Sequence, residues 1–403
     1  MAPKTHPRHA TQAIRAKTII TLAGETAARG KQLFAPLRCL DNGVLLLRAG
    51  RVLDVLPFCR ARLPAGCALV DMGPVCLIPA CVNAHVHLEL THLAGKTLWG
   101  QGFVSWLASL IPLLCLPPNV ERMTAACQDM RRCGTLYVGN IAGSLPEGMA
   151  LADAALHACG LHVNHFCEWF GFGAPYADGR YPWPPRCRAY VLAKAARRAA
   201  PGGHALYSTG PDVLCAAHAY CMGQGLVFSF HLAESPEEHD LLTSGSGGLR
   251  QLYDRVVLPR DWTAPGLSPV AYAQHLGLLG PGTLAVHCVQ VDATEVRTLA
   301  ASQTAVCLCP RSNRNLGVGC PPLAAMLQEE CLLCLGTDGL TSNDSLDVLH
   351  EALWLRETLD VPPQALIRML TVNGASALRF CAAGRLEAGG PASFCVLPQG
   401  LTP

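Results

Sequence analysis

From residue 75 onward, short apolar runs alternate with stretches whose apolar residues recur at helical spacing. Each apolar run ends in polar residues, as expected for a buried strand that leaves a hydrophobic interior. Eight strand candidates follow this pattern: VCLIPACVNAH (75–85), TLYVGNIAG (135–143), LHVNHFCEWFG (161–171), HALYSTG (204–210), LVFSFHLAE (226–234), TLAVHCVQ (283–290), AVCLCPRSN (305–313) and LLCLGTDG (332–339).

Helix-like segments lie between these strand candidates. Their apolar residues recur about every 3.6 positions, and many are rich in alanine. The clearest are VERMTAACQDMRRCG, MALADAALHACG, CRAYVLAKAARRAA and SLDVLHEALWLRETL. Strand and helix in repeated alternation predict an α/β fold. We favour a closed (β/α)8 TIM barrel, with an open doubly wound sheet as the alternative.

Both ends of the chain have a different pattern. Residues 13–80 contain short β-branched runs broken by glycine and proline, and residues 385–398 return to this style. Such runs are typical of a small antiparallel sheet. We therefore predict a small β domain from residues 1–74 plus 380–403, and a barrel from residues 75–379.

The segment from 235 to 275 is long for one connection and carries a glycine-serine run. It is predicted to form either a partial lid over the barrel mouth or a surface excursion.

The composition limits the kind of partner. Half of the 403 residues are hydrophobic, 15% are charged and the formal net charge is +2, so no acidic partner or nucleic acid is implied. The longest apolar stretch, FVSWLASLIPLLCL (103–116), is short for a membrane span, and the basic segment MAPKTHPRHATQAIRAKT has no apolar core of a signal peptide. We expect a small-molecule substrate, no nucleic acid or membrane partner, and a cytoplasmic location.

The 21 cysteines are odd in number and sit mostly in apolar runs, which favours reduced, buried thiols. One alternative is a structural metal site, because Cys331 and Cys334 form a C-x-x-C pair with Cys307 and Cys309 elsewhere. Their predicted positions in buried strands argue against it, since such side chains cannot all converge on one ion.

Polar side chains gather where the predicted strands end. In VNAHVHLEL (82–90), His85 and His87 are one residue apart and would share one face of a strand. Taken singly, each such residue has a structural explanation, for example a turn aspartate. Together they predict one site, because catalytic groups of parallel barrels come from these strand ends. The candidates are His85, His87, His231, Glu234, His287 and Asp338.

Three neutral imidazoles and one carboxylate suit a divalent ion, Zn²⁺ first and Fe²⁺ second, with one position left for water. Glu234, three positions beyond His231, is placed to shuttle a proton. His287 is placed to hydrogen-bond Asp338 or the bound water.

These residues resemble the amidohydrolase superfamily, in particular its zinc-dependent branch of chlorohydrolases, guanine deaminase and deaminases of adenosine-like nucleosides. The likeness runs from about Ile14 to the C-terminus, through NAHVHLE, HALYST, FHLAES, AVH, CPRSN and LGTDGLTSND in the family's order. It implies a distorted (β/α)8 barrel with a small composite β-sandwich formed by both termini, and it allows a homodimer.

The resemblance also implies roles for the candidate residues. The ligands of one Zn²⁺ per chain would be His85, His87, His231 and Asp338. Glu234 would be the general acid/base, His287 a catalytic histidine beside the ligands, and Asp338 a catalytic residue as well as a ligand. Binuclear relatives need a lysine at the end of the fourth strand, but the lysines between His87 and His231 are Lys96 and Lys194, and neither falls at a predicted strand end. A mononuclear site follows.

The pattern NAHVHLEL, with Trp106 and Leu107 and with CPRSN, is most similar to aminodeoxyfutalosine deaminases of the menaquinone pathway. It predicts hydrolytic release of ammonia from 6-amino-6-deoxyfutalosine. The alternatives are guanine, S-adenosylhomocysteine or methylthioadenosine, adenosine, and a chlorinated triazine. A non-catalytic barrel that only binds ligands is disfavoured because the whole set of candidate ligands is present.

Substrate contacts are predicted for Glu89, His204, Tyr207, Arg311 and Asn313. Glu89 could instead orient a ligand histidine, and the residues around 311–313 could brace a loop, a role that we favour for Ser312. Trp106 would either stack on the substrate or belong to the core. The chain departs from the family pattern at Gly339, where serine is usual, and at Ser393, where aspartate is common.

Overall fold

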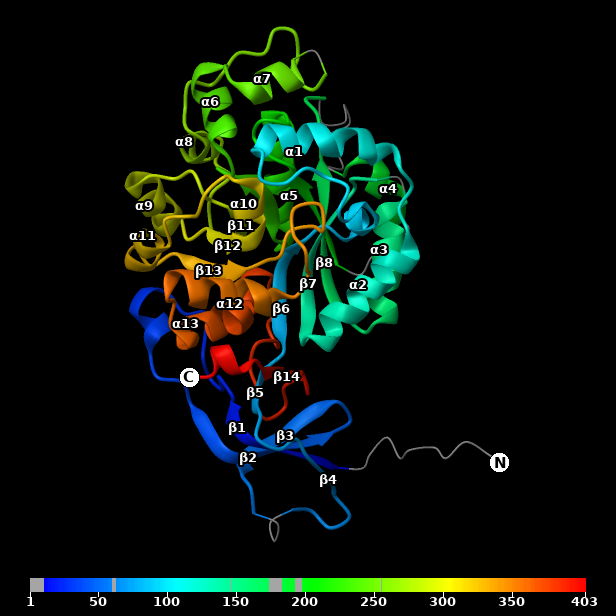
Figure 1. Ribbon diagram of the computed structural model, residues 1–403, viewed down its shortest axis with the longest axis vertical. Helices are drawn as coiled ribbons and strands as arrows, with labels where there is room; N and C mark the ends of the chain where they lie inside the picture. Colours follow the sequence, from blue (N-terminus) through cyan, green and yellow to red (C-terminus); the bar gives the residue numbers. More distant parts are fainter. Residues whose placement is uncertain (1–10, 60–62, 146, 174–182, 193–197, 255) are drawn as a thin grey trace, which may run out of the picture.

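The computed structural model shows a mixed α/β fold in which eight parallel strands form two four-stranded sheets (Figure 1). The residues described are 11–59, 63–145, 147–173, 183–192, 198–254 and 256–403. The first sheet contains β6 (Cys81–Val86), β7 (Thr135–Ala142), β8 (His162–Trp169) and β9 (Ala199–Gly203). The second contains β10 (Phe228–Leu232), β11 (Thr283–His287), β12 (Ala305–Leu308) and β13 (Leu332–Leu335).

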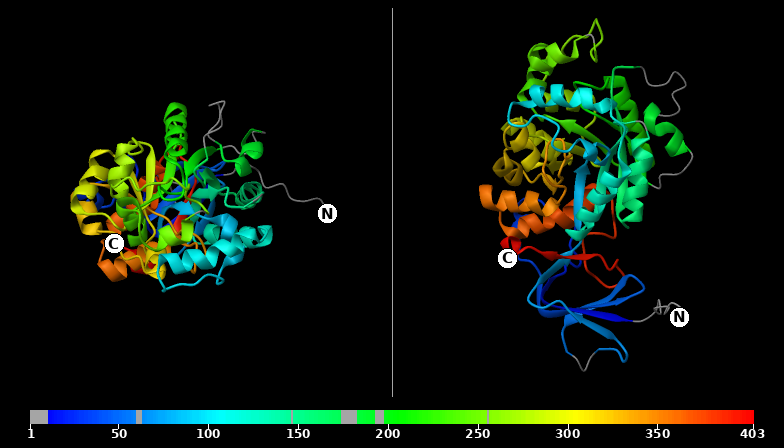
Figure 2. Two further views of the ribbon diagram at one scale, coloured as in Figure 1. Left: turned by 90° about the horizontal axis from the view of Figure 1, so that it is seen from above. Right: turned by 45° about the vertical axis from the view of Figure 1, so that its right-hand side comes forward.

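Helices follow the strands and lie on the outer side of the sheets (Figures 1 and 2). Several begin at side chains that accept a backbone N–H bond, such as Asn119, Ser235 and Asp292. The helices are α1 (Phe103–Leu110), α2 (Val120–Arg132), α3 (Gly148–Ala158), α4 (Pro185–Leu192), α5 (Pro211–Gln224), α6 (Pro236–Ser244), α7 (Gly248–Tyr253), α8 (Pro269–His275), α9 (Ala293–Ala301), α10 (Pro310–Leu316), α11 (Leu323–Gln328), α12 (Val348–Leu359), α13 (Pro363–Arg368) and α14 (Gly374–Ala377).

The two parallel sheets meet at both of their edges. At one seam the His231 N–H donates to the carbonyl of His204 at 2.9 Å. At the other, the N–H groups of Thr337 and Asp338 donate to the carbonyl of His85, each at 3.1 Å. The arrangement is TIM-barrel-like, and it brings the carboxyl ends of all eight strands together.

A third sheet, of six strands, pairs strands from near both ends of the chain. Its strand order is β14-β5-β1-β2-β3, with β4 beside β1, and it lies at the far end of the molecule from α7 (Figure 1). The strands are β1 (Gln12–Ile20), β2 (Cys39–Arg48), β3 (Arg51–Pro57), β4 (Ala68–Asp71), β5 (Cys76–Pro79) and β14 (Phe394–Leu397). β5 pairs in this sheet although it lies beyond residue 74, and the chain continues directly from it into β6.

One predicted strand was misplaced. HALYSTG (204–210) is not a strand; it follows β9, whose sequence is AAPGG. These small residues give no β-branched signal, and close packing explains them: a Cβ on Gly202 would lie 2.9 Å from the carbonyl oxygen of Ser229, and one on Gly203 would lie 2.0 Å from a methyl of Leu214. The predicted helix over 187–200 is partly α4, while its residues 193–197, including Lys194, lie outside the described residues, as do residues 1–10.

The segment from 235 to 275 contains α6, α7 and α8 rather than an irregular loop. Leu241, Leu249 and Tyr253 pack in one apolar cluster with Phe103 and Tyr207. The segment therefore covers the carboxyl ends of the strands together with α1 (Figure 1). Whether it opens as a lid stays a prediction.

Close contact between β6 and β7 gives a first testable prediction. A Cβ on Gly139 would lie 2.2 Å from the carbonyl oxygen of Ala84, a backbone atom that cannot move without shifting the strand. We expect Gly139→Ala to lower the free energy of unfolding by about 1–3 kcal/mol, as overpacking does. Denaturant unfolding would measure this loss.

Gly223→Ala in α5 is the matched control, because a Cβ there meets nothing within 4 Å. It should raise the free energy of unfolding by roughly 0.5–1 kcal/mol through helix propensity. Equal unfolding midpoints for the two variants would contradict the packing described here.

Candidate active site

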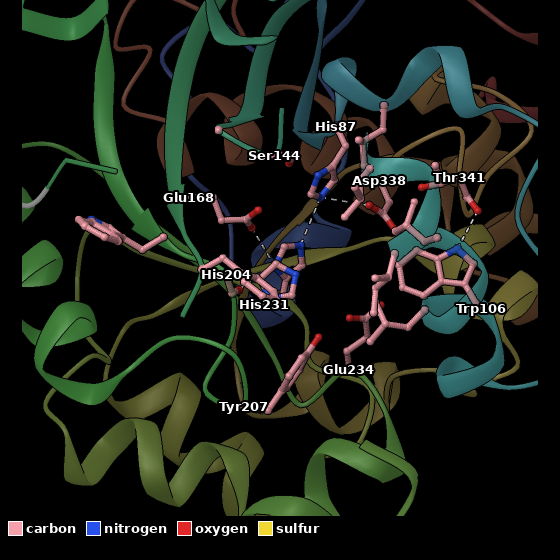
Figure 3. Close-up of a pocket in the computed structure, with 18 of the residues that line it drawn as sticks. His87, Trp106, Ser144, Glu168, His204, Tyr207, His231, Glu234, Asp338 and Thr341 are labelled. Carbon is pink, nitrogen blue, oxygen red and sulfur yellow. Dashed lines mark hydrogen bonds and ion pairs between the residues drawn. The ribbon is translucent and has the colours of Figure 1, made fainter. Parts of the chain in front are cut away.

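A cavity of about 470 Å³ opens at the carboxyl ends of the parallel strands, within the size range of small-molecule sites. One wall is apolar and comes mainly from α1 and the residues after it. The other wall is polar and comes from the strand ends (Figure 3). The polar residues lining the cavity are His87, Ser144, Glu168, Arg186, His204, Tyr207, His231, Glu234, Tyr253, His287, Asp338 and Thr341.

Four predicted ligands converge at the bottom of this cavity. The Nε2 atom of His87 lies 3.1 Å from Nε2 of His85 and 3.3 Å from Nε2 of His231. The Oδ1 atom of Asp338 lies 3.4 Å from His87 Nε2 and 3.6 Å from His85 Nε2. Donors of a tetrahedral zinc ion, each about 2.0–2.2 Å from the metal, are about 3.3–3.6 Å apart. The spacing and the chemistry of these donors therefore fit one zinc-like ion.

Neighbouring groups fix the orientation of two of these side chains. The Oδ2 atom of Asp338 accepts hydrogen bonds from the hydroxyls of Ser312 at 2.7 Å and Ser342 at 2.6 Å, which leaves Oδ1 for the imidazoles. The Nδ1 atom of His231 donates to the carbonyl of His204 at 2.8 Å, so that its Nε2 is the free ligand atom. Such hydrogen bonds orient metal ligands in proteins. Ser312 thus contacts Asp338 and the Ser342 hydroxyl, and serine hydroxyls reach Asp338 although residue 339 is glycine.

Glu234 and His287 form a second polar group beside these donors. The Oε1 atom of Glu234 lies 3.5 Å from Nε2 of His287, and the Glu234 backbone N–H donates to Glu238 at 2.8 Å. The Nδ1 atom of His287 donates to Oδ1 of Asn313 at 2.8 Å. We had predicted that His287 hydrogen-bonds Asp338 or the bound water. Among the described hydrogen bonds, its partner is Asn313 instead of Asp338.

Burial shifts the protonation of these groups in opposite directions. It lowers the pKa of His85 and of His287 to about 4, which keeps both imidazoles neutral at pH 7. Burial by itself would raise the pKa of the Asp338 carboxyl. The close contact with His85 and the charges of the neighbouring imidazoles outweigh this effect and hold that pKa well below its usual range. Burial and then the charge of Asp338 raise the pKa of Glu234 well above its ordinary value. Glu234 is thus suited to hold a proton beside an anionic carboxylate.

The backbone is strained at the same place. His287 has φ 75° and Asp338 has φ 60°, and Ala233, directly before Glu234, has φ 52°. Non-glycine residues in this left-handed region cost about 1–3 kcal/mol each and persist where surrounding structure holds them. The strained residues are thus His287 and Asp338 themselves and the neighbour of Glu234.

The predicted substrate contacts divide into two groups. His204 and Tyr207 line the cavity. Arg311 does not: its side chain pairs with Asp344 and lies 3.8 Å from a carboxylate oxygen of Glu351. Asn313 is fully buried and holds His287 instead of lining the cavity.

Glu89 neither lines the cavity nor orients a ligand histidine through a described hydrogen bond. Its two carboxylate oxygens accept the backbone N–H groups of Gly143 at 2.8 Å and Leu145 at 2.9 Å. Glu89 therefore holds the loop after β7, and Gly143 and Ser144 of this loop form the cavity wall.

Among the cavity residues, Glu168 was missed from sequence and the role of Trp106 was left undecided. Glu168 is the next-to-last residue of β8 and lines the cavity, and burial raises the pKa of its carboxyl well above the ordinary range. The signal was its place at a strand end in FCEWFG, where the same rule that selected the histidines applies. Trp106 lines the cavity and donates from Nε1 to the carbonyl of Thr341 at 2.8 Å.

The cysteines are free thiols, and most are buried. In the described part of the chain, the groups of three side chains able to hold a metal contain histidine, aspartate and glutamate but no cysteine. Cys307 and Cys334 are partners in the register of β12 and β13.

Asn313 gives a second testable prediction. Asn313→Ala removes the acceptor that fixes the ring of His287, so we expect turnover to fall by about 10- to 100-fold, as for other groups that orient a catalytic side chain. Metal content and KM should stay near those of the native chain. Steady-state kinetics with metal analysis would measure both, and loss of metal in this variant would contradict the assigned contact.

The chain is similar in sequence to known proteins. The model of the amidohydrolase family matches residues 76–403. A 5-methylthioadenosine/S-adenosylhomocysteine deaminase of Nitratidesulfovibrio vulgaris (strain DP4) is 31% identical over 353 residues, covering 82% of this chain and 73% of the relative.

Solved structures share the fold. The aminofutalosine deaminase of Helicobacter pylori has a TM-score of 0.80 at 19% identity, covering 97% of this chain and 94% of that one. A zinc-bound adenosine deaminase of Xanthomonas campestris has a TM-score of 0.76 at 22% identity, covering 97% of this chain and 85% of that one.

None of the helices in the described ranges combines the length and apolar character that crossing a bilayer requires.

Proposed function

Because this chain belongs to the amidohydrolase family and is a hydrolase of carbon–nitrogen bonds, we propose that it is a metal-dependent deaminase of adenosine-like nucleosides. The observation that carries this proposal is the spacing of four donor atoms, 3.1–3.6 Å apart in the contacts described. Glu234 and His287 stand beside them at the cavity wall. The strands that carry them would close into a distorted (β/α)8 barrel, with the strands from near both ends of the chain, β5 included, forming a small β-sandwich.

His85, His87, His231 and Asp338 would hold one Zn²⁺ per chain, with Fe²⁺ as the second choice. When bound, such an ion lowers the pKa of a water molecule toward about 7 and supplies hydroxide at neutral pH. Three imidazoles and one carboxylate are a donor set that zinc accepts, and they leave room for substrate on the cavity side.

Glu234 would move the protons of the reaction. As a carboxylate it would take a proton from the attacking water, and as an acid it would give that proton to the ring nitrogen beside the amine-bearing carbon. The hydroxyl left on this carbon then loses its proton to the amine, which departs as ammonia. His287, fixed by Asn313, would stabilise the oxygen during this step.

For the substrate, we put 6-amino-6-deoxyfutalosine first, from the NAHVHLEL and CPRSN motifs. Methylthioadenosine and S-adenosylhomocysteine form the second candidate, because the relative named above is a deaminase of these compounds. All three consist of an adenine nucleoside with a substituent at the 5′ position. The apolar wall that includes Phe103, Trp106 and Leu107 would receive this substituent.

The test is metal analysis combined with an ammonia-release screen over 6-amino-6-deoxyfutalosine, methylthioadenosine, S-adenosylhomocysteine, adenosine and guanine. We expect about one metal ion per chain and ammonia from at least one adenosine-like compound. Activity confined to guanine would overturn the substrate class, and full activity without metal would overturn the mechanism.

A further inference from the structure

We infer that Glu168 and His204 together recognise a hydroxyl group on the ribose of the substrate. This inference rests on the proposed function, since it concerns the same cavity. Glu168 is the next-to-last residue of β8, and its side chain points toward His204 and His231 across the cavity wall (Figure 3).

Glu168 is a buried hydrogen-bond acceptor that lacks a partner. Its side chain exposes 9% of its surface, and its Oε1 atom has no hydrogen-bond partner among the described residues. Oε1 lies 3.5 Å from Nδ1 of His231, but that N–H already donates to the carbonyl of His204 at 2.8 Å. A buried acceptor left without a donor is costly, so a ligand that supplies one gains affinity.

His204 offers the complementary donor. Its Nδ1 atom lies 2.5 Å from the hydroxyl of Ser208, whereas the other acceptor of that hydroxyl, the carbonyl of Ala205, is 3.4 Å away. The Ser208 hydroxyl therefore donates to Nδ1, and the ring proton of His204 sits on Nε2. Since His204 lines the cavity, this N–H is available to a ligand.

The acceptor on Glu168 and the donor on His204 lie close enough together to bind one ligand group that both donates and accepts a hydrogen bond. A carboxylate oxygen of Glu168 and a ring nitrogen of His204 lie within 4.8 Å of each other. A hydroxyl can donate to the first and accept from the second. A second metal ion does not fit, because Nδ1 of His231 carries a proton and its Nε2 belongs to the first set of donors. Adenosine-like substrates carry such hydroxyls at the 2′ and 3′ positions.

The test compares adenosine with 2′-deoxyadenosine and 3′-deoxyadenosine in the native chain, Glu168→Ala and Glu168→Gln. In the native chain, loss of the recognised hydroxyl should lower kcat/KM by about 10- to 100-fold, mainly through KM, as for a buried hydrogen-bonding group left without its partner. Glu168→Ala should lower kcat/KM for adenosine by a similar factor and change that for the matching deoxynucleoside less than about 3-fold. Glu168→Gln keeps a carbonyl oxygen as acceptor at the same place, so its kcat/KM for adenosine should lie between those of the native chain and Glu168→Ala.

Glu89→Gln is the matched control, since Glu89 is another buried glutamate near the cavity whose oxygens are both bonded to backbone amides. It should change kcat/KM for adenosine and both deoxynucleosides by the same factor. If Glu168→Ala changed kcat/KM for adenosine and for both deoxynucleosides by the same factor, the inference would be overturned.

Failure of the proposed function is a separate outcome. If the native chain releases no ammonia from any adenosine-like compound, calorimetric binding of the same three nucleosides still tests Glu168. Tighter binding of adenosine than of one deoxynucleoside, lost in Glu168→Ala, would support the inference. Equal binding of all three to the native chain would overturn it.

Discussion

Glu234→Gln is expected to reduce ammonia release by about 100- to 10,000-fold while the chain keeps its full metal content. The carboxylate lies beside His287 at 3.5 Å and lines the cavity, but it is not among the four proposed ligands. An amide of the same shape can neither take a proton from water nor give one to a ring nitrogen. Steady-state kinetics and metal analysis of the same preparation would measure the two effects separately.

Glu237→Gln is the control for this change, because Glu237 is in α6 only three positions away and does not line the cavity. Its rate should stay within about 3-fold of the native rate, as for most changes away from a site. A Glu234→Gln variant with native turnover would remove Glu234 from the proposed mechanism.

Removal of the metal is expected to abolish turnover, by about 1,000-fold or more, because water near pH 7 is otherwise a poor nucleophile. Dialysis against a chelator followed by one equivalent of Zn²⁺ should restore the rate. The thermal midpoint should fall on dialysis and recover on reloading, since a ligand that binds only the folded state stabilises it.

His231→Ala should give the same loss of turnover, and adding Zn²⁺ should not restore the rate, because the variant lacks one of the converging imidazoles. The control is His239→Ala, an exposed histidine on α6, which should bind zinc and turn over like the native chain. Native activity in the dialysed chain or in His231→Ala would contradict the proposed metal site.

Much of the fold could be predicted from sequence because buried parallel strands are continuous apolar runs. The candidate ligands could be found for a related reason: polar residues at the ends of such runs meet at one edge of the sheets. His85, His87, His231 and Asp338 all follow this rule, and the structure brings them together. β9 was not predicted because its sequence, AAPGG, lacks the β-branched residues typical of strands. Close packing requires small residues there, and such packing cannot be read from a single sequence.

The finer contacts depended on side-chain directions that spacing cannot supply. Arg311 and Asn313 follow a strand as the ligands do, yet they lie in the first turn of α10, and their side chains turn toward Glu351 and His287. Glu89 lies two residues beyond His87, but its carboxylate turns toward the loop after β7. Glu168 could have been selected by the rule that selected the ligands, and only its burial against the cavity distinguishes it from an ordinary surface glutamate.

Anomalous diffraction from crystals at the zinc absorption edge would test the central proposal most directly. We predict one peak per chain, about 2.0–2.2 Å from His85, His87 and His231 Nε2 and from one oxygen of Asp338. A peak among Cys307, Cys309 and Cys334, or no bound ion in a fully active enzyme, would contradict it.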